Sequence, residues 1–102
     1  MFAAACAEPE RPLLTQFFAL SRLRDLTRLG VISTVVFEPR EQGTIATFDI
    51  RNVAVRREGG VEVKDVSIVA PVRLPSGRTE SQTWIVTLAH KPEGWRVVGL
   101  RR

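Results

Sequence analysis

Residues 58–78 read EGGVEVKDVSIVAPVRLPSGR, and this stretch determines the fold prediction. Its apolar residues alternate with other residues in the period of two that indicates a β-strand. Short loops with glycine stand at both ends, Glu58–Gly59–Gly60 and Pro75–Ser76–Gly77–Arg78. Because a parallel crossover needs a dozen or more residues, loops this short must join antiparallel strands. The sequence therefore predicts an antiparallel meander built around residues 61–74.

Strand patterns continue on both sides of this stretch. Residues 31–37, 44–57, 79–90 and 95–100 are rich in apolar or β-branched residues, and turns are predicted at 39–43 and 91–94. The inward parity changes near Arg51–Asn52 and again near Lys64–Asp65. One extra residue at each place would restore a single inward face. We therefore expect a β-bulge near Arg51–Asn52, and a second bulge or a strand break at Lys64–Asp65, in a sheet of four or five strands.

Before the strands, residues 11–29 carry apolar side chains at spacings of three and four, which predicts one long helix. Gly30 is the predicted stop, since glycine accepts the left-handed conformation that closes a helix. The apolar stripe is wide, so we expect a kink near Ser21 or a sheet that covers the helix on more than one side. Leu26 is then expected to pack on the sheet. A helix on one face of an antiparallel sheet is an α+β architecture.

The composition fits one domain without a membrane span. The chain has 102 residues, of which 44% are hydrophobic and 25% are charged, with a single cysteine. Its uncharged apolar runs, such as residues 31–37, fall far short of the roughly 18–20 residues of a transmembrane helix. The net charge is +4, but the basic residues are scattered along the chain. Nucleic acid is not an expected partner, because phosphate binding needs a clustered basic patch.

Residues 1–10, MFAAACAEPE, differ in character from the single domain predicted at residues 11–102. Ala3–Ala4–Ala5–Cys6 resembles the end of a bacterial lipobox, in which small residues precede a cysteine that receives diacylglycerol and a polar tether follows. The resemblance implies lipid attachment at Cys6 and a membrane-anchored location in the bacterial cell envelope. Only five residues precede Cys6, whereas a signal peptide has a basic region and a longer apolar stretch. A cytoplasmic chain with an incidental thiol therefore stays open as the other interpretation.

The predicted helix, the bulged antiparallel strands and the closing sequence GWRVVGL at residues 94–100 also carry a resemblance. They resemble the cystatin-like and nuclear-transport-factor-2-like group of folds over residues 11–102. The resemblance implies a cystatin-like α+β domain with a concave sheet face. The group includes enzymes, ligand carriers, dimerisation modules and bacterial lipoproteins, so the fold by itself does not choose a function.

The sequence contains no recognisable catalytic, metal-binding or cofactor-binding motif. His90 is the only histidine, and Cys6 has no Cys-x-x-Cys partner. A solvated loop position is the simpler interpretation of His90. The other interpretation is a general base, which would need an orienting carboxylate such as Asp25, Asp49 or Asp65.

Five residues mark a candidate pocket on the concave face of the predicted sheet: Phe48, Asp49, Trp84, His90 and Trp95. For the two tryptophans, packing on the helix is the simpler interpretation, and lining a ligand cavity is the other. For Asp49, a solvated outward position is the simpler interpretation, because it alternates with inward neighbours.

Two functions stay open. The first is a non-enzymatic lipoprotein domain of the bacterial cell envelope, tethered through Cys6, that acts as an interaction or ligand-binding module for an unidentified protein or small ligand. The alternative is a cytosolic, homodimeric small-molecule-binding protein or enzyme of the nuclear-transport-factor-2-like group, whose site would use Asp49, His90 and Trp84. The sequence predicts no cofactor, and it leaves the oligomeric state undetermined.

Overall fold

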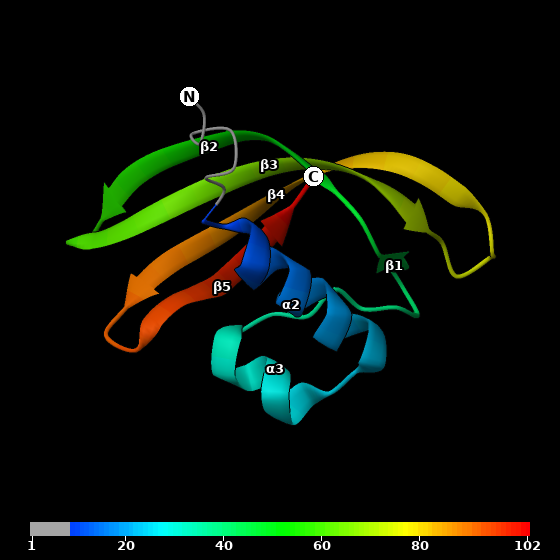
Figure 1. Cartoon of the computed structure of the whole chain (residues 1–102), viewed down its shortest axis with the longest axis horizontal. Helices are drawn as coiled ribbons and strands as arrows, with labels where there is room; N and C mark the ends of the chain where they lie inside the picture. The colour runs from blue at the N-terminus through cyan, green and yellow to red at the C-terminus, as the bar shows by residue number, and fades with distance from the viewer. Residues whose placement is uncertain (1–8) are drawn as a thin grey trace.

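The computed structural model describes residues 9–102 and has an α+β architecture (Figure 1). Two helices come first in this part of the chain, α2 (Arg11–Leu23) and α3 (Leu26–Ile32). Five strands follow: β1 (Thr44–Ile45), β2 (Asp49–Glu58), β3 (Val61–Arg73), β4 (Thr79–Lys91) and β5 (Gly94–Arg101). The antiparallel sheet curls around α2, which lies across its concave face. The predicted fold class is therefore confirmed.

Strands β3 and β4 form the centre of the sheet. Both β1 and β2 pair with the outer edge of β3, and β5 pairs with β4 on the other side. From β2 to β5, each strand is joined to the next by a short hairpin loop, as the sequence predicts. In the first loop, Gly59 and Gly60 have φ angles of 58° and 81°. These left-handed values are the ones that a two-residue hairpin turn of type I′ requires.

The strand predicted at residues 44–57 is interrupted. Its pairing with β3 stops at Ile45 and resumes at Asp49, so three residues of this edge oppose two residues of β3. One of those two is Pro71, which has no N–H to donate to a neighbouring strand. Phe48, at the end of the gap, is buried in the core.

One predicted bulge is confirmed and one is wrong. The register of β2 and β3 shifts at Arg51–Asn52, as expected. No shift occurs at Lys64–Asp65, where β3 pairs regularly with both neighbours. The parity change there has another cause, because Val63 is buried on the convex face while later residues of β3 are buried on the concave face. The second shift lies instead between β4 and β5, at Thr87–Leu88.

The single long helix predicted at residues 11–29 is wrong, because the chain breaks after Leu23. Arg24 takes the left-handed conformation, with a φ angle of 52°. The side chain of Asp25 then accepts a hydrogen bond from the backbone N–H of Arg28 and caps the start of α3. Aspartate is a favoured residue at this capping position. The helical segment is therefore divided into two helices of different direction (Figure 1).

The break changes the roles of the residues beyond it. Gly30 lies inside α3 and its φ angle is not positive, so it is not the predicted stop. The strand predicted at residues 31–37 does not form; its first two residues continue α3, and the rest is irregular apart from one parallel bridge to β5. Leu29 and Ile32, three residues apart, both pack on the core, a spacing that favours helix over strand. Leu26, expected on the sheet, is instead 54% exposed.

The core lies between α2 and the concave face and contains a connected set of aromatic rings. The ring of Phe18 lies 5.0 Å from that of Phe17, 5.6 Å from Phe37 and 5.8 Å from Phe48, measured between centroids. Phe37 in turn contacts Trp84 at 5.1 Å. Edge-to-face contacts of this kind add to the free energy gained by burial. Aliphatic residues of β3 and β4 complete the core: Val66, Ile68, Ala70, Val72, Val86 and Leu88.

The break between α2 and α3 predicts that two leucines of α3 contribute unequally to the free energy of unfolding. Leu29 is 3% exposed, and we expect Leu29→Ala to lower the free energy of unfolding by about 2–5 kcal/mol. Leu26 is 54% exposed, and Leu26→Ala should cost less than about 1 kcal/mol. Both variants carry the same leucine-to-alanine change in the same helix, so urea unfolding of the two compares a buried with an exposed position. Equal losses would contradict the break, because one continuous helix would bury both residues.

Candidate functional site

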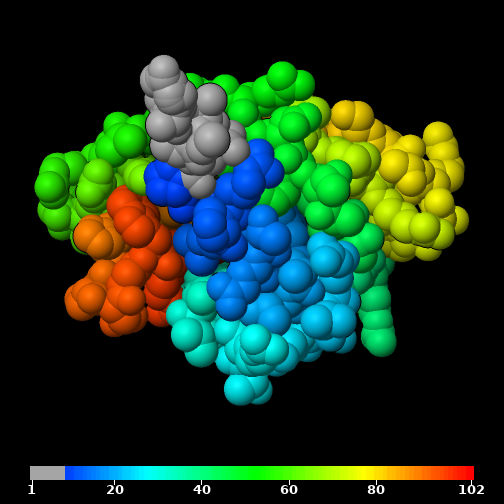
Figure 2. Space-filling view, viewed as in Figure 1, coloured from blue at the N-terminus to red at the C-terminus, as the bar shows by residue number. Residues whose placement is uncertain are grey.

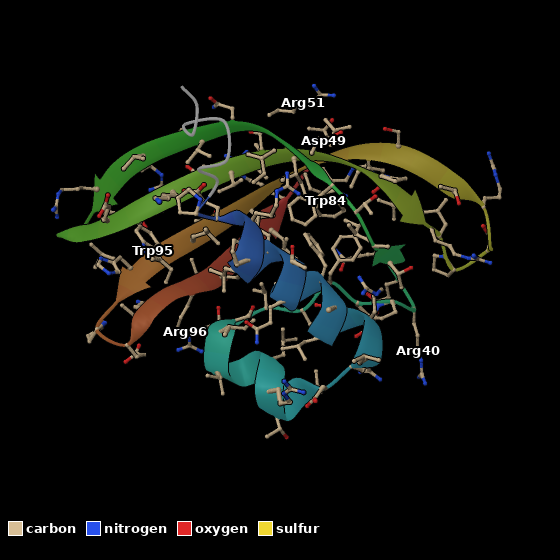
Figure 3. The ribbon with its side chains drawn as sticks, viewed as in Figure 1. Arg40, Asp49, Arg51, Trp84, Trp95 and Arg96 are labelled. Atoms are coloured by element: carbon tan, nitrogen blue, oxygen red, sulfur yellow. The ribbon has the colours of Figure 1, made fainter. Side chains whose placement is uncertain are left out.

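Two of the five candidate pocket residues belong to the core. Phe48 and Trp84 are buried, and each contacts another aromatic ring. Trp84 Nε1 donates a hydrogen bond to Gln82 Oε1 at 2.8 Å, so the one polar atom of its ring already has a partner. In Figure 3 the ring lies between the sheet and α2. This position matches the packing interpretation of Trp84.

Asp49 lies on the other face of the sheet. It is exposed and pairs with Val69, whereas the next residue, Ile50, packs against the core. Side chains alternate between faces along a strand, so Asp49 points to the convex side. Figure 3 shows it near Arg51 and well away from Trp95.

The remaining two candidates lie together. His90 and Trp95 are opposite each other in the register of β4 and β5. Their rings stack with 4.7 Å between centroids and an interplanar angle of 15°. Lys64 Nζ lies 4.6 Å from the centroid of Trp95 and donates a hydrogen bond to Glu10 Oε2 at 2.7 Å. We call Glu10, Lys64, His90 and Trp95 the Trp95 cluster.

One part of the Trp95 cluster is shielded from water and the other part is exposed. The side chains of Glu10 and Lys64 are only 8% and 17% exposed, so the two charges pair in a region largely shielded from water. Shielded charges need such a partner, because the cost of removing them from water is otherwise large. The imidazole of His90, in contrast, is exposed. The cluster therefore offers a stacked ring and imidazole hydrogen-bonding atoms to a partner.

A second polar group lies on the convex face. Arg56 Nε donates a hydrogen bond to Asp65 Oδ2 at 2.9 Å, and Thr87 Oγ1 donates one to Asp65 Oδ1 at 2.9 Å. The hydrogen bond from Arg56 lowers the pKa of Asp65; burial opposes this shift, and the hydroxyl of Thr87 adds to it. A carboxylate bound through both oxygens is a weak proton acceptor. We assign this group a structural role.

None of the three aspartates named above as possible partners of His90 orients its imidazole. Asp25 caps α3, Asp65 is held by Arg56, and Asp49 is on the convex face. The geometry therefore does not assemble the histidine–aspartate pair that a general base would use.

Two open depressions lie on the described surface. One, of about 260 Å³, lies beside α3 and is lined by Leu26, Leu29, Gly30, Ser33, Thr34, Val35 and Val36. The other, of about 230 Å³, is lined by residues of the hairpin strands, among them Val61, Val63, Ala89 and Val98. Neither is lined by the five residues predicted from the sequence. Both are smaller than the roughly 300–1,000 Å³ of typical ligand pockets.

Cys6, the predicted lipid attachment site, lies outside the described residues. Within residues 9–102, no three His, Cys, Asp or Glu side chains gather as metal ligands, and neither helix is long and apolar enough to cross a membrane. Comparison with protein-family models, with curated proteins and with solved structures found no match to this chain.

No motif in the sequence marks Glu10 and Lys64 as members of the site. Lys64 shares the even parity of Val66 and Ile68, a signal that places its side chain on the concave face. Its contact with Glu10 joins residues 54 positions apart, and no local pattern encodes such a contact.

The shielded ion pair makes a stability prediction. Lys64→Met keeps an unbranched apolar stem near Trp95 but leaves the carboxylate of Glu10 without its partner. We expect this change to lower the free energy of unfolding by about 1–3 kcal/mol. The control is Lys91→Met, which removes the only other lysine of the chain. Urea unfolding should show a clearly larger loss for Lys64→Met, and equal losses would contradict the shielding of the pair.

The group around Asp65 makes a pH prediction. Its pKa is lower in the folded protein than the ordinary value of 3.8, so the ionised form stabilises the fold above that value. This contribution is lost as pH falls through the lower folded pKa. The thermal midpoint of Asp65→Asn should therefore lie below that of the wild type at pH 7, and the gap should narrow in strong acid. A difference in thermal midpoint that stays constant over this pH range would refute the assignment.

Proposed function

We propose that this chain is a non-enzymatic binding module of the bacterial cell envelope, tethered to the membrane through a lipid on Cys6. The lipobox resemblance at residues 3–6 supports the tether, and the position of Glu10 adds a geometric consequence. Glu10, four residues after Cys6, is fixed to the sheet by Lys64. Four residues span at most about 14 Å. A lipid on Cys6 would therefore hold the Trp95 cluster close to the membrane surface.

The binding surface in this proposal is the open side of the Trp95 cluster. The observation that carries it is the stack of His90 on Trp95, left open beside a charge pair that is already neutralised. Val55, which pairs with Lys64, adds an exposed aliphatic side chain to the same face of the sheet. A stacked aromatic surface with an imidazole and an aliphatic neighbour suits a peptide segment or a flat small ligand. Stacking and hydrogen bonding, rather than proton transfer, are the chemistry that these side chains offer.

The alternative, a cytosolic small-molecule-binding protein or enzyme, would need a different set of residues. Asp49 lies on the convex face, Trp84 lies in the core, and His90 lies on the Trp95 cluster. We also propose that the chain is related to the cystatin-like and nuclear-transport-factor-2-like group. The helix lying in a curled antiparallel sheet supports this relation.

The tether is tested by metabolic labelling with a fatty acid in a bacterial host, using the gene together with its upstream region. We expect label on the wild type, recovery of the wild type with the membrane fraction, and loss of both in Cys6→Ser. Circular dichroism of Cys6→Ser should match that of the wild type, because the substitution only replaces a sulfur atom with oxygen. Absence of label on the wild type, or equal label on both proteins, would refute the tether.

A further inference from the structure

The helical layer carries most of the net charge of the chain. Residues 11–37 contain four arginines and one acidic residue, a net charge of +3 out of the +4 of the whole chain. Three of these arginines, Arg22, Arg24 and Arg28, are exposed around the turn between α2 and α3. Arg24 pairs with Glu38 at 3.4 Å, whereas the guanidinium of Arg28 has no ion-pair partner in the described part of the chain. The turn is therefore a basic surface.

The end of α2 and helix α3 also expose apolar side chains. Leu23, at the end of α2, is 75% exposed, and Leu26 and Val31 on α3 are 54% and 71% exposed. Among the described residues, the only other large hydrophobic side chain so exposed is Val55 on β2. Exposed helix faces are normally polar, yet α3 has the sequence LTRLGVI with one charged residue. We call Leu23, Leu26, Val31, Arg22, Arg24 and Arg28 the α2–α3 corner; its α3 part projects at the lower edge of Figure 2.

We infer that the α2–α3 corner docks on an anionic lipid surface. Aliphatic side chains on a projecting turn can enter the boundary between headgroups and acyl chains, while neighbouring arginines stay among the phosphates. The positive charge of the corner complements such a surface. Three aliphatic side chains are too few to bury the roughly 800 Å² per partner of a stable protein interface. A second copy of the chain, or another protein, therefore fits the corner less well.

This inference deepens the proposed function and rests on it for the membrane location, but its physical basis is separate from Cys6. Helix α2 runs from the Glu10 end to the corner, a length of about 20 Å for its thirteen residues. A lipid on Cys6 and the corner would thus contact the membrane at the two ends of one helix. The helical layer then faces the lipid, and the convex face of the sheet, with Arg56 and Asp65, faces away from it.

The test measures binding of the full chain, without lipid, to vesicles by co-sedimentation. We expect binding to vesicles that contain phosphatidylglycerol, and little binding to vesicles of phosphatidylcholine alone. The affinity should fall in about 0.5 M salt, because salt screens the arginines. Arg28→Gln should weaken binding roughly five-fold, the effect expected for one charge near an anionic surface. Leu23→Ser combined with Leu26→Ser should weaken it about ten-fold or more, through loss of apolar burial.

Matched controls place comparable changes elsewhere. Arg78→Gln removes one positive charge from an exposed position in the loop between β3 and β4, and Ala54→Ser changes an exposed apolar side chain on the convex face, beside Asp65. Both should leave vesicle binding within about two-fold of the wild type, since neither residue belongs to the corner. Equal losses in controls and corner variants would show binding through net charge alone and overturn the inference.

Two further outcomes would also overturn it. The first is an absence of binding to phosphatidylglycerol vesicles by a folded wild type. The second is a wild type that sediments as a dimer and a Leu26→Ser variant that sediments as a monomer, which would make the corner a contact between copies. These results do not depend on fatty-acid labelling at Cys6. The proposal of a lipid tether and the proposal of membrane docking by the α2–α3 corner can therefore be refuted separately.

Discussion

The ring of Phe18 is the contact through which distant parts of this chain are held together. It packs against Phe17 of its own helix, against Phe37 of the irregular segment after α3, and against Phe48 at the interruption between β1 and β2. A curled sheet with an aliphatic concave face needs such cover, because exposing that face to water costs about 25 cal/mol per Å². Helix α2 supplies the cover, and Phe18 joins the cover to the edge of the sheet. The positions of the Trp95 cluster and of the α2–α3 corner, near the two ends of α2, follow from this packing.

The parts of the fold that could be predicted from the sequence are those encoded by local patterns. Glycine-containing loops and alternating strands predict the antiparallel meander, and these features need no knowledge of distant residues. The helix break could not be predicted from glycine or proline, because Arg24 adopts a left-handed conformation that residues other than glycine rarely take. Asp25 was an available signal, since aspartate before an apolar residue favours a new helix start. Leu29 and Phe37 pack in the core through contacts with distant residues. These contacts, which no local pattern reveals, explain why the predicted strand at residues 31–37 does not form.

The same distinction between local patterns and distant contacts applies to the candidate site. His90 and Trp95 flank a short hairpin loop, so their pairing follows from antiparallel register and could be inferred from the sequence. The shielded pair of Glu10 and Lys64 depends on where α2 begins relative to the middle of the sheet, which no local pattern reveals. The two tryptophans differ for a related reason. Trp84 lies under the helical layer and is buried, whereas Trp95 lies on the last strand and is only partly buried.

The central claim is that α2 and the sheet unfold as one cooperative unit, and that α3 is docked on the surface of this unit as a separate element. Native-state hydrogen exchange, followed amide by amide with increasing denaturant, tests this claim most directly. The account predicts that the buried interior of α2, around Phe17 and Phe18, exchanges with the same free energy as the centre of β3, and that α3 opens at a lower free energy. If α2 opens at a lower free energy than β3, or if α3 opens only with global unfolding, the claim is contradicted.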